Sequence, residues 1–277
     1  MLFYDIYHKK GVVMASVFNF YLSRVIGNEL ITKNDEVIGK VKDFIVDFNY
    51  VKPMVKALQI KSEGKVRNID FSEVEIKKFK NKFVVYCNDL KDIEIPSENT
   101  ILLNKWVIDR QIVDINGRKV VRVNDLRLTT VSTGTYLLAV DVGLEGLLRR
   151  LGLALIVKSI LAPLNKSIPT KLILWDDVET IDTSHAGIKL SKTYTKLHTL
   201  HPSDLADIIE DLDRNTQTAI FKSLDDEKAA DVLEELEADA QKNILESISL
   251  EKAADVLEKM PADEVADILD ELEQDKA

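Results

Sequence analysis

The sequence predicts a multidomain α+β protein in which two small β-barrels precede an all-α superhelix built from 12-residue helical repeats. A strand-like pattern recurs at an offset of 82 residues in the first two thirds of the chain, and a gapless 12-residue helical pattern fills the last quarter. The charge divides at the same place, because residues 203–277 hold 24 Asp/Glu and 7 Lys/Arg, whereas residues 1–202 hold 23 and 30. Such a division indicates parts with different partners or solvent behaviour.

The strand-like repeat aligns Val25 with Val107, and Asp43 with Asp125. Later segments match at an offset of 104 residues, so the second copy contains an insertion. Both copies alternate apolar and polar residues between turn signals such as Asn116-Gly117, a pattern typical of short strands and hairpins and favouring small barrels. We expect these boundaries: an N-terminal extension at 1–19, a first barrel at 20–96, a second barrel at 103–183, a linker at 184–200 and the superhelix at 201–277.

The first copy resembles the PRC-barrel family through Gly39, Val41 and Asp43, and the resemblance extends over the second copy. The second copy departs from the family pattern at Val121, where the first copy has Gly39. The resemblance implies an adaptor that binds protein or RNA and carries no catalytic residues.

The insertion predicts a helix over about 144–162, because six apolar residues recur at helical spacing: Leu144, Leu147, Leu148, Leu151, Leu155 and Ile156. Two interpretations stay open. We favour a helix that caps its own barrel, since Pro163 and Pro169 close the segment tightly. The alternative is a basic amphipathic helix, carrying Arg149 and Arg150, that docks on a membrane surface or a partner.

The last quarter divides into six blocks of twelve residues from Ser203, and the octapeptide EKAADVLE occurs at both 227–234 and 251–258. Apolar residues at block positions 6, 7 and 10 share one helical stripe, which a single short helix cannot bury but stacked helices can. A coiled coil would need a seven-residue period instead. The stripe predicts that these residues are buried: Leu212, Ile220, Leu233, Leu245 and Leu257.

Residues 201–212, HPSDLADIIEDL, and the blocks after them resemble the N-terminal cytosolic domain of the MgtE magnesium transporter family. The resemblance implies a right-handed superhelix whose acidic surface takes part in sensing Mg²⁺. In that family a pair of CBS domains and a membrane channel follow. This chain has the two β-rich copies in front, and no CBS pair or apolar membrane span, so we interpret it as a fragment of a longer CBS-containing protein.

Crowded carboxylates are the predicted metal ligands, because Mg²⁺ prefers hard oxygen donors. The candidates form two clusters, and the alternative is a solvated outer face of the helices: Asp231, Glu234 and Glu235, and then Asp267, Asp270 and Glu271. We expect weakly bound Mg²⁺ and no other cofactor. His198 and His201 could supply half of a zinc site, but the His201-Pro202 pair is also a suitable start for the first helix.

The sequence contains no phosphate-binding loop, nucleophile elbow or zinc-protease motif, so we expect no enzyme. A single cysteine, Cys87, fits a cytoplasmic compartment. We therefore predict a cytosolic regulatory module that senses Mg²⁺ and passes its state to protein partners, such as a divalent cation transporter or the CBS domains. The alternatives are an interaction scaffold without an ion response and an RNA- or ribosome-associated adaptor. We expect no DNA partner, RNA is disfavoured because no basic cluster has interleaved aromatics, and homodimer formation stays open.

Overall fold

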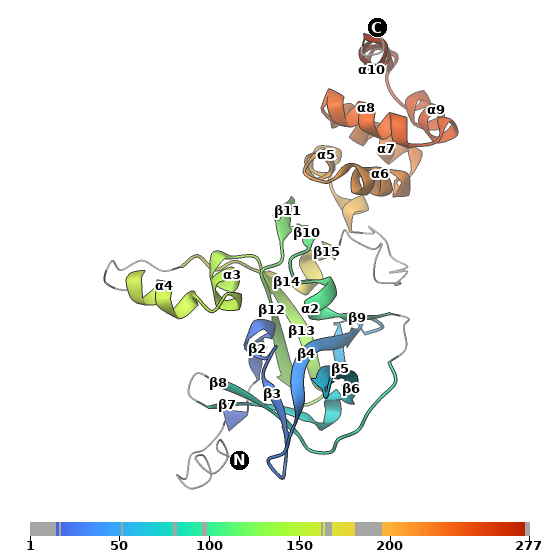
Figure 1. The fold of residues 1–277 in the computed structure, drawn as a ribbon. Helices are drawn as coiled ribbons and strands as arrows, with labels where there is room; N and C mark the ends of the chain where they lie inside the picture. The colour runs from blue at the N-terminus through green and yellow to red at the C-terminus, as the bar shows by residue number, and fades with distance from the viewer. Residues whose placement is uncertain are drawn as a thin grey trace. The chain divides into compact units, whose positions relative to one another are not determined.

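The computed structural model describes residues 15–16, 18–50, 52–79, 82–95, 99–161, 163, 168–180 and 196–274. Most of the predicted extension, 1–19, and of the predicted linker, 184–200, therefore lies outside the described residues. The chain forms two compact units. The first, which we call the β unit, comprises Met1–Arg110, Arg122–Asp176 and Ser184–Lys189, and the second, the helical unit, comprises Gln111–Val121, Asp177–Thr183 and Leu190–Ala277. The mixed α+β class is as predicted, with a curled half-barrel sheet and a region of six helices (Figure 1).

The β unit is built on one large sheet. Its strands are β1 (Ala15–Ser16), β2 (Asn19–Tyr21), β3 (Glu29–Thr32), β4 (Val37–Asp47), β5 (Met54–Ser62), β6 (Lys65–Asp70), β7 (Val74–Phe79), β8 (Lys82–Cys87), β9 (Thr100–Leu102), β12 (Asp125–Val131), β13 (Gly134–Asp141) and β14 (Leu172–Leu174). The order is β1-β7-β8-β3-β4-β5-β13-β12-β2, while β6, β9 and β14 pair with β5, β4 and β13. Only the β3–β8 pair is parallel among the described strand pairs.

The secondary structure repeats at the offsets that the sequence predicts. At 82 residues, the short helix η1 (Leu22–Arg24) corresponds to α2 (Leu103–Trp106), and β3 corresponds to β10 (Gln111–Asp114). At 104 residues, η2 (Phe71–Glu73) corresponds to η4 (Trp175–Asp177), and β7 to β15 (Val178–Thr180). Val25 and Val107 are buried in both copies, as their shared apolar character indicates.

The two copies exchange their first strands. Strand β2 of the first copy pairs with β12 of the second, placing Phe20 opposite Leu128. Strand β9 corresponds to β2 at the 82-residue offset and so belongs to the second copy, although it precedes the predicted boundary at 103; it pairs with β4 of the first copy, placing Ile101 opposite Val46. The described strands therefore do not divide into one separate sheet for each predicted barrel, because each copy supplies an edge strand to the sheet of the other.

The departure from the PRC pattern at Val121 has a structural reason. In the first copy β4 continues unbroken along β5, and a Cβ atom at Gly39 would lie 2.6 Å from the Lys61 carbonyl oxygen. In the second copy the corresponding stretch is split into β11 (Lys119–Arg122) and β12, and β13 pairs only with the latter part. Val121 therefore meets no such backbone approach, and a side chain is tolerated there.

The insertion forms two short helices where the sequence predicts one. They are α3 (Leu144–Arg150) and α4 (Ala154–Leu161), and the chain between them passes through Gly152 at a φ of 74°. A left-handed residue ends a helix, so the continuous stripe of apolar residues is broken there. The single helix predicted over 144–162 is therefore wrong, although both halves are helical.

The helical unit contains α5 (Pro202–Glu210), α6 (Arg214–Ser223), α7 (Asp226–Glu235), α8 (Ala238–Ser247), α9 (Leu250–Glu258) and α10 (Ala262–Gln274). The short helix η5 (Leu197–Thr199) precedes them. A small sheet in the order β11-β10-β15 belongs to the same unit, and its Val113 is buried in one core with the helices. Part of the second β-rich copy thus packs with the helices.

The helices stack in alternation, with α5, α7 and α9 in one row and α6, α8 and α10 in the other. Leu212, Ile220 and Leu233 are buried as predicted. Leu245 and Leu257 are only half-buried, which corrects the prediction for these two residues. They lie on α8 and α9, in the later part of the described stack, and both pack against the edge of the buried core.

Side-chain contacts explain the 24-residue spacing of the identical octapeptides. Lys228 Nζ donates to the carbonyl oxygen of Leu200 (2.5 Å), and Lys252 Nζ donates to that of Leu224 (2.8 Å). In the alternate helices, two glutamines that are also 24 residues apart repeat another contact: Gln217 Nε2 donates to Ile209 O and Gln241 Nε2 to Leu233 O. The structural repeat is therefore a pair of helices, in which polar side chains satisfy carbonyl groups at helix ends and in the loop before α5.

Candidate functional site

The predicted metal ligands lie on the surface of the helical unit. Asp231, Glu234 and Glu235 are exposed on α7, and Asp267 and Asp270 are exposed on α10. The side chain of Glu271 lies outside the described residues. The structure therefore keeps the α7 residues together on one exposed face, as the helical spacing predicts.

Exposed carboxylates recur from one stacked helix to the next. Asp207, Asp231 and Asp255 occupy equivalent, exposed positions on α5, α7 and α9. Packed helices are about 8–10 Å apart, so these side chains form a row of like charges on one face, which we call the acidic row. A row of this kind attracts cations by its summed field even without a dedicated binding cage.

No group of three or more His, Cys, Asp or Glu residues close enough to hold a metal ion occurs among the described side chains. Mg²⁺ commonly keeps several water ligands and binds through one or two carboxylates. The exposed pairs on α7 are of that kind, and the assignment of Asp231, Glu234 and Glu235 as ligands stays a prediction.

The two histidines near the first helix each contact a different serine. His198 Nε2 lies 3.2 Å from Ser223 Oγ, and His201 Nδ1 lies 2.9 Å from Ser203 Oγ. His201 is the residue before the first turn of α5, where Pro202 occupies a position that needs no backbone N–H. This geometry supports the interpretation that the His-Pro pair starts the helix.

A small cavity of about 410 Å³ lies beside α6 and α8 and opens to solvent. Its lining is polar and of mixed charge: Arg214, Asp239, Lys242, Asn243 and Glu246. Cations and carboxylates alternate in this lining, so it does not select a ligand of one charge.

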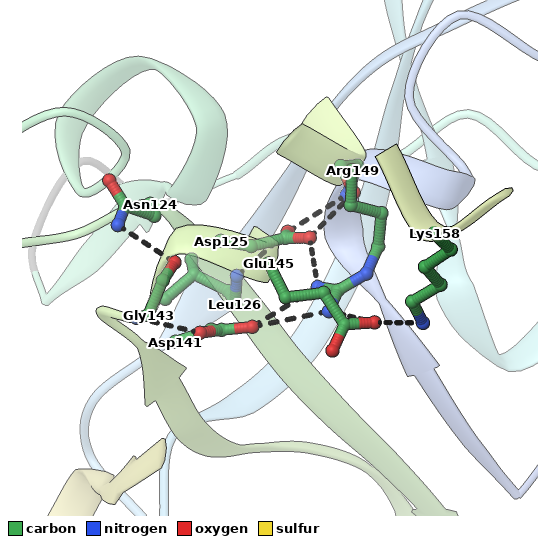
Figure 2. Close-up of polar contacts among 9 residues, drawn as sticks. Asn124, Asp125, Leu126, Asp141, Gly143, Glu145, Arg149 and Lys158 are labelled. Carbon is green, nitrogen blue, oxygen red and sulfur yellow. Dashed lines mark hydrogen bonds and ion pairs between the residues drawn. The ribbon is translucent and has the colours of Figure 1, made fainter. Parts of the chain in front are cut away.

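A buried ionic centre lies in the β unit, and Figure 2 shows its charged residues. The Arg149 guanidinium of α3 donates to Asp125 Oδ2 (2.8 Å) and to Asp141 Oδ2 (3.2 Å), and it lies 3.4 Å from the centre of the Tyr21 ring. Glu145, one turn earlier on α3, is 3.9 Å from the same guanidinium. The centre joins the insertion to strands of both copies.

The absence of a side chain at Gly146 leaves room for this centre. A Cβ atom there would lie 2.7 Å from Cγ of Asp141, so a larger residue would push the carboxylate away. Burial raises the pKa of Asp141 above its ordinary value, while the Gly143 N–H and Arg149 act in the opposite direction. Because its charged groups pair with one another, the centre is suited to holding the two copies together.

The 82-residue repeat in the sequence aligns Asp125 with Asp43, but the sequence pattern did not predict the structural role of either residue. Each carboxylate accepts hydrogen bonds from the backbone of the opposite copy: Asn104 and Lys105 donate to Asp43, and Ser23 donates to Asp125. The signal was present, since an acidic residue recurs within an apolar strand at the 82-residue offset. Its partners lie far away in the chain, so the pattern could not name them.

Asp43 has no counterpart of Arg149, because the insertion occurs only in the second copy. Burial raises the pKa of Asp43 to about 6, although the backbone N–H groups of Asn104, Phe44 and Lys105 oppose the change. A carboxyl in this setting changes its charge close to neutral pH.

The helical unit thus contains six short helices in stacked pairs, with acidic residues recurring on one face. The first of these helices, α5, lies within the motif at 201–212. Residues 200–277 match the MgtE intracellular N domain. Residues 19–92 match the PRC-barrel domain, which places β2 to β8 of the first copy in that domain type. Comparison with curated proteins finds no match.

The MgtE N domain match begins just before α5 and includes all six helices of the stack. Both matched domain types are non-catalytic. Within the described ranges, no helix combines the length and the apolar character needed to cross a bilayer. The pairing of a PRC-barrel domain with an MgtE N domain points to a regulatory module related to magnesium transport.

Proposed function

We propose that this protein is a non-catalytic, cytoplasmic sensor module of divalent cation transport, in which the helical unit responds to Mg²⁺ and the β unit binds a protein partner. The observation that carries this proposal is the MgtE N domain match over the same helices that present the acidic row. The finer fold description, a right-handed superhelix, is part of the same proposal.

The ion response would act through charge. Residues 203–277 carry 24 acidic and 7 basic side chains, so their folded form is strained by like-charge repulsion. Asp231 and Glu235 lie one turn apart on α7 and are both exposed. A hydrated Mg²⁺ held between such carboxylates would relieve the repulsion and stabilise the stack without requiring a closed cage.

A partner would complete the site. The carboxylates of α7 leave the ion open to solvent, so a second surface that supplies further oxygen ligands would bind more tightly when Mg²⁺ is present. A divalent cation transporter, or CBS domains attached to it, is the kind of partner that the MgtE N domain indicates. The β unit, through its PRC-barrel domain, would hold a second protein in place.

Thermal unfolding of the full chain tests the ion response. We expect millimolar MgCl₂ to raise the melting temperature of the helical unit above its value in NaCl of equal ionic strength, because an ion that binds only the folded form stabilises it by RT ln(1 + [L]/Kd). The NaCl arm removes the effect of screening alone. The Asp231→Asn/Glu235→Gln double variant should shrink the difference between the two salts.

A matched control is available in the identical octapeptides. Glu251 and Glu258 are exposed at the two ends of the second copy, on α9, so Glu251→Gln/Glu258→Gln removes the same charge without changing α7, which carries the Asp231–Glu235 pair. It should leave the Mg²⁺-specific shift in place. Coincident melting curves in both salts would reject ion sensing by this chain and favour the scaffold function. A scaffold function would agree with the lack of a three-ligand cluster among the described residues.

A further inference from the structure

The hairpin formed by β10 and β11 lies in different surroundings from its counterpart in the first copy. At the 82-residue offset it corresponds to β3 and the beginning of β4, which belong to the β unit, where β3 pairs with β8. The β10–β11 hairpin instead belongs to the helical unit and pairs with β15. In only one of the two copies, therefore, is the hairpin part of the helical unit.

One face of this small sheet contributes to the core of the helical unit. Val113 is fully buried in that core, and Ile115 and Val120 pack against it. Leu197 of η5 and Leu205 of α5 are fully buried in the same core. A stack of short helices needs a cap at its ends, because a terminal helix has a stacked neighbour on one side only. The small sheet supplies apolar contacts of this kind.

Two polar contacts join the sheet to the beginning of the stack. Arg118 Nη1, in the turn of the hairpin, donates to Asp204 Oδ1 in the first turn of α5 at 3.1 Å. Lys196 Nζ, just before η5, donates to the carbonyl oxygen of Val178 in β15 at 2.7 Å. The sheet is thus fixed to the end of the stack at which α5 lies.

A buried carboxylate holds the turn of the hairpin. Asp114 is 3% exposed, and its Oδ1 accepts a hydrogen bond from Gly117 N at 2.8 Å. A Cβ atom at Gly117 would overlap the same carboxylate, so a side chain there would displace it. Ile115 N also donates to the carbonyl oxygen of Asp177 at 3.0 Å. These contacts give the hairpin one defined shape, in which its apolar face stays toward the helices.

The hairpin is continuous with the β unit at both ends. The β unit extends to Arg110 and resumes at Arg122. Just outside the hairpin the two connecting segments pair, because Asp109 N donates to Val123 O at 3.0 Å and Val123 N donates to Arg110 O at 2.9 Å. A change in the hairpin would therefore act on two segments of the second copy that are hydrogen-bonded to each other.

We propose that the β10–β11 hairpin, together with β15, couples the helical stack to the second β-rich copy, so that whatever stabilises the stack also stabilises that copy. The coupling rests on the proposed function for the identity of the ligand, Mg²⁺, and names the element that transmits its effect. Opening of α5 would remove buried neighbours of Val113 and the partner of Arg118, so the stack and the hairpin open together. By linkage, a partner that binds and stabilises the second copy in turn stabilises the stack.

Hydrogen exchange of the full chain, followed by mass spectrometry, tests the coupling without any ion. The peptides to compare cover 109–124, which include the hairpin, and 27–42, the corresponding residues of the first copy. Leu233→Ala removes buried atoms from α7 and should raise exchange in 109–124 by more than about tenfold, while 27–42 stays unchanged. Ala230→Gly lowers only the helix propensity of α7. It should act in the same direction more weakly, and it decides the test if Leu233→Ala folds poorly.

The reverse direction is tested from the hairpin. Val113→Ala shortens a side chain in the shared core and should raise exchange in α5, at 202–210. Ile31→Ala is the matched control, because Ile31 occupies the corresponding position of the first copy and is half-buried there. It should leave exchange in α5 unchanged. Unchanged exchange of α5 in Val113→Ala would overturn the coupling.

Exchange in MgCl₂ and in NaCl of equal ionic strength separates this proposal from the proposed function. Slower exchange of both α7 and 109–124 in MgCl₂ supports the coupling. Slower exchange of α7 alone would overturn it, as would unchanged exchange of 109–124 in the α7 variants. If neither region is slowed by MgCl₂, the ion response is rejected, whereas the α7 variants still decide the coupling.

Discussion

Asp43 and Asp125 are related by the 82-residue repeat, and each anchors a backbone segment of the opposite copy. Asp43 Oδ1 accepts from Asn104 N at 2.7 Å, and Asp125 Oδ1 accepts from Ser23 N at 3.1 Å. Both segments are first turns of short helices, whose N–H groups lack helical partners. The two copies are therefore joined by the same contact made twice, once in each direction, but only Asp125 has an arginine beside it.

This difference predicts a pH dependence. The pKa of Asp43 is raised by burial from 3.8 to about 6. A group whose pKa is higher in the folded state stabilises the fold fully below its unfolded value, and that stability is lost as the pH rises through the folded value. The contribution of Asp43 should thus fall by about 2–3 kcal/mol between pH 4 and 7, because each unit of pKa difference corresponds to ~1.4 kcal/mol.

Urea unfolding of the parent chain and Asp43→Asn across this pH range measures the contribution. The difference in unfolding free energy between the parent chain and Asp43→Asn should change by up to that amount, because the parent becomes less stable as the pH rises. Asp92→Asn is the control of opposite sign, because the hydrogen bond from Arg67 lowers the pKa of the exposed Asp92. A pH-independent difference for Asp43→Asn would show that its carboxyl titrates normally.

The exchange of strands predicts that the matched PRC segment is not an independent folding unit. In a fragment covering 18–95, β4 lacks its neighbour β9, and Phe20 on β2 loses the strand that holds it beside Leu128. Unpaired backbone groups and an uncovered apolar edge destabilise such a sheet. We expect this fragment to show no cooperative unfolding transition, whereas 18–180 should show one. Two-state unfolding of the shorter fragment would refute the interdependence.

Local patterns were predicted well, and long-range pairings were not. The 12-residue period places Leu233 in the core, because the helical stripe is decided by neighbours three and four residues away. The first barrel was expected to begin at Phe20, but the sequence says nothing of the partner of this residue, which lies more than 100 residues on at Leu128. Gly152 could equally have been a tolerated residue within a helix.

The two arginines of the insertion likewise have partners that the local sequence pattern does not predict. Arg149 and Arg150 are neighbours in the sequence and were interpreted together as a basic edge of the helix. In the structure Arg149 is buried between two carboxylates, while Arg150 forms a surface pair with Asp109. Helical spacing fixes their directions relative to α3, but only the position of α3 on the sheet decides which arginine is buried.

That contrast predicts a large difference between two similar substitutions. Arg149→Met would leave Asp125 and Asp141 buried without a cation, and breaking a buried pair in this way costs about 3–5 kcal/mol. Arg150→Met removes a partly exposed pair, for which about 0–1 kcal/mol is usual. Denaturant unfolding of the two variants compares them directly, and equal losses would mean that the ionic centre contributes little to holding the copies together.

The helical stack predicts a graded response to truncation of its apolar stripe. Leu233 is fully buried on α7, whereas Leu257, at the equivalent position on α9, is half-buried. Replacement of a buried leucine by alanine costs about 2–5 kcal/mol, through lost transfer energy and the cavity left behind. Leu257→Ala should cost clearly less, because its neighbours can relax and water can reach the site. The helical circular dichroism signal, followed through a urea titration of each variant, gives both values on the full chain. A loss below about 0.5 kcal/mol for Leu233→Ala would reject the burial of the stripe, and equal losses for the two variants would show that the stack is as tightly packed at α9 as at α7.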